Sequence, residues 1–218
     1  ADSEDKLGLT VNWERKLING IGYAVSTRLY DADRTNGTKL LDGNARFSIG
    51  YRPLDSKWIV LNRLEYQIRN EIDLLFASSR ERKLINNAVA NYKPSYENQL
   101  SLNYGIKYAL NNFSGTEYSG ITHLIGGEYR HDINSQFDFG MHAHTLYSTN
   151  SSNYKYSLGV SAGWSMAKNV WLSFGYNFDG FEDDDFSAAG YTAAGPYIRF
   201  RLKFDSDSIK QFDSWRKE

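Results

Sequence analysis

Strict two-residue alternation of apolar and polar side chains is the feature that most constrains how this chain folds. It is clearest in residues 195–204, whose polar face carries Tyr197, Arg199, Arg201 and Lys203 and whose apolar face carries Ile198, Phe200, Leu202 and Phe204. A period of two predicts a β-strand with one apolar and one polar face. Three cations on one strand face are too many for the core of a soluble protein. They fit a strand whose polar face lines a wet interior while its apolar face contacts lipid, as in a transmembrane β-barrel.

Ten further segments alternate in the same way, so eleven strands are read directly from the sequence. These lie at residues 7–14, 21–29, 44–52, 58–69, 84–92, 100–108, 121–130, 137–147, 156–164 and 170–178. Most contain about ten residues, the length that a tilted strand needs to cross a bilayer. Because bacterial single-chain barrels have even strand numbers, we expect about twelve strands. The missing one would lie around residues 73–77 or be supplied from upstream in a longer chain.

The connections between these segments alternate in length. The shorter ones are residues 18–19, 53–56, 93–97, 132–135 and 167–169, and the longer ones are 31–43, 72–83, 110–120, 149–153 and 179–194. Short turns at one end and longer loops at the other are typical of outer-membrane barrels, in which the short turns are periplasmic. The sequence therefore predicts an all-β fold, a transmembrane antiparallel up-and-down β-barrel over residues 1–204, followed by a periplasmic tail at 205–218.

A soluble lipocalin-like barrel or sandwich would also alternate, with its apolar side chains inside. The polar faces of this chain, however, are rich in small residues such as Gly140, Ser157 and Gly175. Glycine weakens a solvent-exposed strand, whereas small residues suit a crowded barrel interior. Aromatic residues make up 15% of the chain, which fits the aromatic girdles at the two membrane interfaces. The bacterial outer membrane, with its lipid, is therefore the expected location.

Composition excludes several other classes. The chain has no cysteine, so it has no disulfide framework and no thiolate metal site. Its net charge of −1 argues against a general nucleic-acid binder. The first five residues do not resemble a signal peptide, so we expect either that one has been removed or that this is the terminal part of a longer chain. No Gly-x-Ser-x-Gly, His-Glu-x-x-His or phosphate-binding loop is present, and we expect neither a cofactor nor a metal.

The C-terminal part of the chain resembles a known group of proteins. The run at residues 170–187 (VWLSFGYNFDGFEDDDFS) continues to 190–205 (GYTAAGPYIRFRLKFD), and 61–66 (LNRLEY) and 129–132 (YRHD) belong to the same pattern. These segments resemble the C-terminal outer-membrane β-barrel region of large repeat-bearing surface proteins of Gram-negative bacteria. The resemblance implies a barrel that anchors a large extracellular or repeat region, and it implies no known catalytic residues. The last strand also resembles the signal read by the barrel-assembly machinery, which normally ends a chain.

In a barrel, the charged residues of the polar faces would line the lumen. The candidate lumen-lining residues are Arg28, Arg46, Arg63, Glu65, Arg69, Lys107, Glu128, Arg130, Asp138, His142, His144, Arg199, Arg201 and Lys203, together with Arg52, Glu14 and Glu71. One interpretation is a selectivity-setting pore lining, whose excess of cations would favour anions. The other, which we favour, is a network of paired charges that plugs a narrow barrel, because unpaired buried charge is costly.

Two further clusters have competing interpretations. His142 and His144 share a strand face with Asp138, and this arrangement would suit acid–base chemistry in a membrane-embedded hydrolase. Hydrogen bonding inside a polar lumen explains the histidines more simply. The acidic run 182–185 would offer oxygen ligands to Ca²⁺, but a solvated acidic loop is favoured, with Phe181 and Phe186 pinning it over the barrel mouth.

The leading functional hypothesis is a non-enzymatic outer-membrane barrel that anchors or helps display a larger cell-surface assembly. Its expected partners are outer-membrane lipid, the barrel-assembly machinery, and an extracellular passenger or other subunits. The first alternative is a small channel for ions or small anionic solutes, and the second is the hydrolase. Liposome conductance separates the anchor from the channel.

Overall fold

The computed structural model describes residues 4–17, 19–34, 37–73, 78–167, 170–187 and 194–202. These residues form eleven β-strands and no helix. The strands are β1 (Glu4–Lys16), β2 (Ile21–Arg34), β3 (Lys39–Tyr51), β4 (Trp58–Ile72), β5 (Ser79–Tyr92), β6 (Asn98–Phe113), β7 (Thr116–Asp132), β8 (Phe137–Ser148), β9 (Asn153–Ala167), β10 (Val170–Asp179) and β11 (Gly195–Leu202). The described part of the chain thus contains no helix long and apolar enough to cross a membrane.

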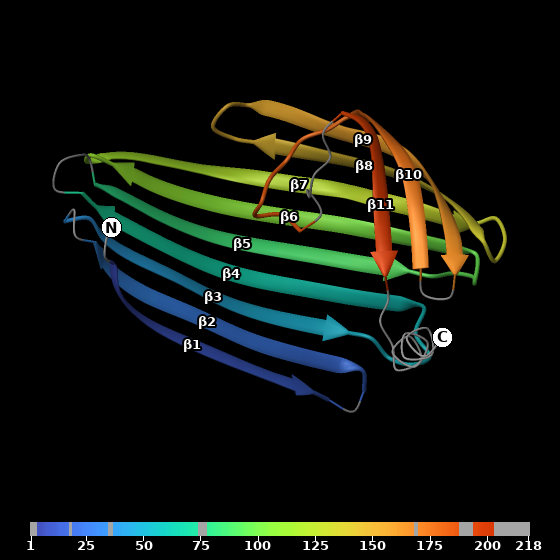
Figure 1. Ribbon diagram of the computed structural model, residues 1–218, viewed down its shortest axis with the longest axis horizontal. Coiled ribbons are helices and arrows are strands. Elements are labelled where there is room, and N and C mark those ends of the chain that lie inside the picture. The colour runs from blue at the N-terminus through green and yellow to red at the C-terminus, as the bar shows by residue number, and fades with distance from the viewer. Residues whose placement is uncertain are drawn as a thin grey trace, which may run out of the picture.

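All eleven strands belong to one sheet, in which each strand pairs with the next along the chain. Every pairing is antiparallel, as the registers of β1 with β2 and of β10 with β11 illustrate. The sheet is strongly curved, so that β9, β10 and β11 turn over toward the face that β1–β7 present in Figure 1. This confirms the predicted all-β, antiparallel up-and-down fold. Within the described residues β1 and β11 each keep one unpaired edge, and no twelfth strand is found.

The strands extend further into the expected loops than alternation alone indicated. The connection expected at residues 110–120 is reduced to Ser114 and Gly115, because β6 ends at Phe113 and β7 begins at Thr116. Both residues have positive φ angles, of 50° and 84°, as a two-residue hairpin turn of type I′ requires. Among the connections at this end of the sheet, only the one between β10 and β11 remains long. Residue 73 lies outside the strands, and residues 74–77 are not among those described.

The convex face of the sheet is largely apolar, although it also carries polar residues such as Arg82 and the hydrogen-bonded pair Asn62–Asn86. Each strand exposes at least one large hydrophobic side chain on this face: Leu9, Val25, Phe47, Leu64, Leu84, Leu102, Ile125, Met141, Leu158, Phe174 and Ile198. The cross-strand registers place these residues on the same side of the sheet, since Val25 faces Phe47 and Phe47 faces Leu64. An exposed apolar surface of this extent is too large for an ordinary monomer in water and marks a surface that contacts a partner or lipid.

Aromatic pairs flank the aliphatic part of the convex face. At the end of the sheet with the β1–β2 and β3–β4 turns, the Trp13 and Tyr23 rings lie 5.1 Å apart, and Trp58 stacks on Tyr92 at 4.5 Å. At the opposite end, Tyr147 stacks on Tyr154 at 4.5 Å, and Tyr176 contacts Phe178 at 5.4 Å. Two aromatic belts bordering an aliphatic band are the pattern of a strand-built membrane surface.

The concave face carries the alternate side chains and is polar. Several of its glycines lie beneath large side chains of neighbouring strands. A Cβ atom at Gly126 would collide with the His144 ring, and one at Gly163 would collide with the Asp138 carboxylate. The small residues of the polar face therefore make room for the large ones, which confirms that this face is crowded.

Candidate functional site

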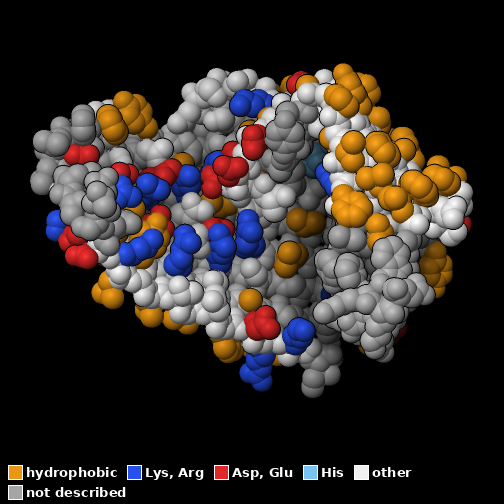
Figure 2. All heavy atoms as spheres, viewed as in Figure 1, with side chains coloured by type: hydrophobic (Ala, Val, Ile, Leu, Met, Phe, Trp, Pro, Cys, Tyr) orange, Lys and Arg blue, Asp and Glu red, His pale blue; other side chains and the backbone are white. Residues whose placement is uncertain are grey.

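The strand registers bring the predicted polar-face residues to the concave face. Arg46 pairs with Glu65, Glu128 pairs with His142, and Ser173 pairs with Arg199. By the same registers the face also holds Arg28, Arg63, Arg69, Lys107, Arg130, Asp138 and His144. Figure 2 shows lysine and arginine side chains gathered across this face, with acidic side chains between them. The side chain of Arg201 and all of Lys203 fall outside what the structure describes.

Glu65 is the centre of a hydrogen-bonded group on β3 and β4. Its side chain is only 3% exposed, and its Oε1 atom lies 3.0 Å from Nη2 of Arg46. Asn44 and Gln67 donate hydrogen bonds to the same oxygen, at 2.5 and 2.8 Å. Arg63 adds a longer contact of 3.6 Å to Oε2. A carboxylate this buried is stable only with such partners, so Glu65 fixes the spacing of two arginines.

Arg28, Arg69 and Lys83 on the same face are also paired, two of them with acids that the sequence analysis missed. Arg28 lies 3.5 Å from Asp42, and Lys83 lies 2.9 Å from Glu81. Asp42 and Glu81 fall in segments expected to be loops, which is why they were not assigned to the polar face. The charged residues that the sequence assigned to the polar face therefore overstated its excess of positive charge.

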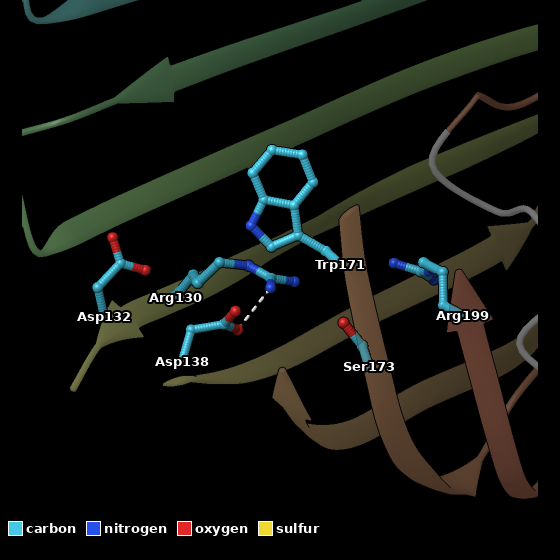
Figure 3. Close-up of a pocket in the computed structure, with 6 residues that line it drawn as sticks. All are labelled: Arg130, Asp132, Asp138, Trp171, Ser173 and Arg199. Atoms are coloured by element: carbon cyan, nitrogen blue, oxygen red, sulfur yellow. Dashed lines mark hydrogen bonds and ion pairs between the residues drawn. The ribbon is translucent and has the colours of Figure 1, made fainter. Parts of the chain in front are cut away.

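A second group of charges lies near the turn end of β7 and β8. Arg130 donates to Asp138 at 2.6 Å and to Glu128 at 2.9 Å. Arg130 and Asp138, together with Trp171 and Arg199, border a cavity of about 180 Å³. Figure 3 shows Arg199 approaching this cavity from β11, across from the Arg130–Asp138 pair.

His142 and His144 lie side by side on β8, as their spacing predicted. Their ring centroids are 5.8 Å apart, and Nε2 of His144 is within 3.4 Å of the Asn103 amide nitrogen. The described residues contain no group of three or more His, Cys, Asp or Glu side chains arranged to hold a metal ion. A hydrolytic role for this pair stays a hypothesis, and an ester-hydrolysis assay of His142→Ala and His144→Ala variants would test it.

The most distinctive feature of the concave face is part of the β10–β11 connection, residues 180–187, which we call the inner loop. It folds back onto the face instead of extending from the end of the sheet, and it reaches β5 and β6. The Lys107 ammonium on β6 lies 2.9 and 2.7 Å from the two carboxylate oxygens of Asp183. It also lies 3.0 Å from Oδ2 of Asp185, which is 3.5 Å from Lys83. One lysine thus holds two loop carboxylates.

Asn87 on β5 holds the backbone of the inner loop. Its amide nitrogen donates to the carbonyl oxygen of Asp185 at 3.0 Å. Its amide oxygen accepts a hydrogen bond from the backbone nitrogen of Ser187 at 3.3 Å. Asn87 is itself buried, so its side chain satisfies two backbone groups that would otherwise be costly to bury.

Two phenylalanines of the inner loop pack into the concave face. Phe181 and Phe186 form a buried cluster with Leu124 on β7 and Leu146 on β8, and Phe186 is only 2% exposed. Gly105 provides the space, because a Cβ atom there would lie 2.5 Å from the Phe186 ring. The expectation that these phenylalanines pin the loop is consistent with this cluster. The expectation of a solvated acidic loop is wrong for Asp183 and Asp185 because both bind lysine, whereas Glu182 and Asp184 are exposed.

Comparison with known proteins adds little. No protein-family model and no curated protein sequence matches this chain. Among solved structures, the chain is similar to one described as a NanC porin structure in a rhombohedral crystal form. The two share 12% sequence identity, the match covers 90% of this chain and 99% of that chain, and the TM-score is 0.37. A likeness of this size carries no functional conclusion, so function is inferred below from the residues themselves.

Proposed function

We propose that this chain is an outer-membrane β-barrel whose interior is filled by paired charges and by the inner loop. In this proposal it anchors or helps display a larger cell-surface assembly of a Gram-negative bacterium, and it does so without enzymatic activity. The expected partners are outer-membrane lipid and, during insertion, the barrel-assembly machinery. The apolar convex face with its two aromatic belts supports the membrane location.

One observation carries the anchoring role, namely that the inner loop occupies the concave face as part of the packed structure. Its contacts combine a buried aromatic cluster with a lysine that holds two carboxylates. A passage for solutes would need this space to be open, whereas an anchor gains rigidity when it is filled. Paired charges such as Arg46–Glu65 and Arg130–Asp138 further narrow the interior.

The direction of the first strand also suits an anchor. Glu4 begins β1 at the end of the sheet that carries the β2–β3 and β10–β11 connections. Longer loops of outer-membrane barrels face the cell exterior. Any polypeptide joined directly ahead of Glu4 would therefore leave the barrel on the extracellular side.

Planar-bilayer conductance tests the proposal. The refolded chain is expected to give no steady, salt-dependent conductance, because the inner loop closes the interior. A variant in which residues 180–187 are replaced by a short glycine–serine linker serves as the control and is expected to conduct. Steady conductance by the unmodified chain would contradict the filled anchor and favour the channel alternative.

The display role needs a separate measurement. An epitope-tagged passenger fused ahead of residue 1 is expected to be accessible to antibody on intact Gram-negative cells. A passenger that becomes accessible only after the outer membrane is permeabilised would overturn the display role while leaving the filled barrel intact.

A further inference from the structure

A second hollow on the concave face lies beside the inner loop and is not filled by it. It is a cavity of about 290 Å³ that is lined by residues of β2, β3, β4 and β5. Its polar lining consists of Arg28, Asp42, Asn44, Arg46, Gln67, Arg69, Glu81 and Lys83. This volume is at the lower end of small-molecule sites, so it suits a compact ligand rather than a polymer.

The charges around the cavity are arranged asymmetrically. Four cations line it, against two carboxylates. Two further acids hold lining arginines without lining the cavity themselves, since Glu65 binds Arg46 at 3.0 Å and Glu71 binds Arg69 at 3.4 Å. The cationic groups therefore face the hollow more than the acidic groups do.

The arginines keep donors available. The side chains of Arg28, Arg46 and Arg69 remain 59%, 48% and 49% exposed despite their carboxylate contacts. A guanidinium carries five N–H donors, and each of these salt bridges uses one nitrogen of its arginine. The register places them around one row of the sheet. Arg28 pairs with Asn44 and Asn44 with Gln67, while Arg46 and Arg69 each lie two positions from that row along their own strands. Planar forks converging on one hollow match the oxygens of phosphate or carboxylate groups.

We infer that this cavity binds a small polyvalent anion bearing phosphate or carboxylate groups. The inference goes beyond the proposed anchor, and a closed interior is compatible with it because binding requires no passage.

Lys83 connects this site with the inner loop. Its ammonium lines the cavity and also lies 3.5 Å from the Asp185 carboxylate of the loop. A bound polyanion competes with Asp185 for Lys83, so it weakens one of the loop's contacts while Lys107 keeps the others. Binding is therefore expected to make the inner loop somewhat more accessible to protease.

Calorimetric titration with pyrophosphate, using the folded chain in neutral detergent, tests the inference. Saturable binding with one ion per chain is expected. Arg28→Gln and Arg69→Gln variants are each expected to weaken it at least tenfold. Arg199→Gln is the matched control, because it removes the same charge from the same face outside the cavity, and it should leave the affinity within about twofold. Each variant is run on a gel without heating. Migration at the same shifted position as the unmodified chain confirms that the variant is folded.

Two outcomes would overturn the site. One is the absence of saturable pyrophosphate binding by the folded chain. The other is an equal loss of affinity in Arg199→Gln, which would indicate general attraction to a basic surface. Neither outcome depends on the conductance measurement, so failure of this site and failure of the proposed anchor are distinguishable.

Discussion

Lys107 and Asp183 are 76 positions apart in the sequence, yet the Lys107 Nζ atom lies 2.7 Å from Oδ2 of Asp183. Both side chains are largely buried, at 14% and 15% exposure. Removing one partner of such a pair leaves an uncompensated charge, which is far more costly than losing a surface salt bridge. The contact between β6 and the inner loop is therefore where the loop is most sensitive to substitution.

Replacing Lys107 with methionine should release the inner loop. The substitution keeps an unbranched side chain of similar length but leaves the carboxylates of Asp183 and Asp185 without their shared ammonium. Limited proteolysis should show cleavage within residues 180–187 at least tenfold faster than in the unmodified chain. Lys155→Met removes a charge from β9 and serves as the control. Unchanged cleavage in Lys107→Met would show that the aromatic cluster and the Asn87 and Lys83 contacts hold the loop without Lys107.

Phe186→Ala should lower the free energy of unfolding by about 3 kcal/mol, because it leaves a cavity beside Leu124 and Leu146. Phe174→Ala removes the same ring from the exposed convex face, where it leaves no cavity, so it should cost clearly less than Phe186→Ala. Urea unfolding in lipid vesicles measures both. Equal losses would argue against a buried position for Phe186.

Gly105→Ala should be destabilising only while Phe186 is present. The added methyl group would lie 2.5 Å from the Phe186 ring and displace it. In the Phe186→Ala background the ring that the methyl group would meet is absent, so the same substitution should change the unfolding free energy by less than about 0.5 kcal/mol. Independent effects would instead add. A double-mutant cycle measured by urea unfolding gives the coupling, and simple additivity would refute the contact.

Adjacent residues on β6 should respond oppositely to a new charge. Leu102 is exposed on the convex face, whereas Asn103 lies on the concave face. Leu102→Arg should cost about 2–4 kcal/mol in lipid, as expected for a cation on a lipid-facing strand surface, and Asn103→Arg should cost much less. Folding yield into vesicles checks this order. The reverse order would mean that the convex face does not contact lipid.

Glu65→Ala should cost about 1–3 kcal/mol, since it leaves the Arg46 guanidinium and the amides of Asn44 and Gln67 without the carboxylate that they share. Glu71→Ala breaks a single, more exposed bridge to Arg69 and should cost less than about 1 kcal/mol. Thermal unfolding of the two variants under identical conditions compares them. Similar unfolding midpoints for the two variants would show that Glu65 is not the centre of this hydrogen-bonded group.

The fold was predictable because apolar and polar side chains alternate with a period of two residues along its strands. Leu102, Tyr104 and Ile106 alternate with Asn103 and Gly105, so the strand and its two faces follow from local sequence. The same reasoning placed Arg46, Glu65 and Arg130 on one face without any knowledge of their neighbours. Strand ends were less predictable, because the alternation fails near the loops, where Arg80 and Arg82 occupy positions of the convex face.

The inner loop was largely beyond prediction from the sequence. Its partners Asn87 and Lys107 lie 98 and 76 positions away from the aspartates that they contact. No local periodicity records such a pairing, so the acidic run looked like solvent-exposed loop. The signal that pointed the right way was the pair of phenylalanines, Phe181 and Phe186, on either side of four acidic residues, since two large aromatic side chains in a polar segment need burial.

The inner loop has a mechanical consequence that follows from where its ends are attached. It leaves from β10 and fastens to β6, and these strands are four spacings apart in the sheet, or roughly 19 Å along the arc. The loop therefore links β10 to β6 directly across the concave face, and it resists any flattening of the curved sheet between them. Cleavage of the loop should reduce the curvature of the sheet at β8 and β9. Part of that curvature is thus maintained by a segment that belongs to no strand.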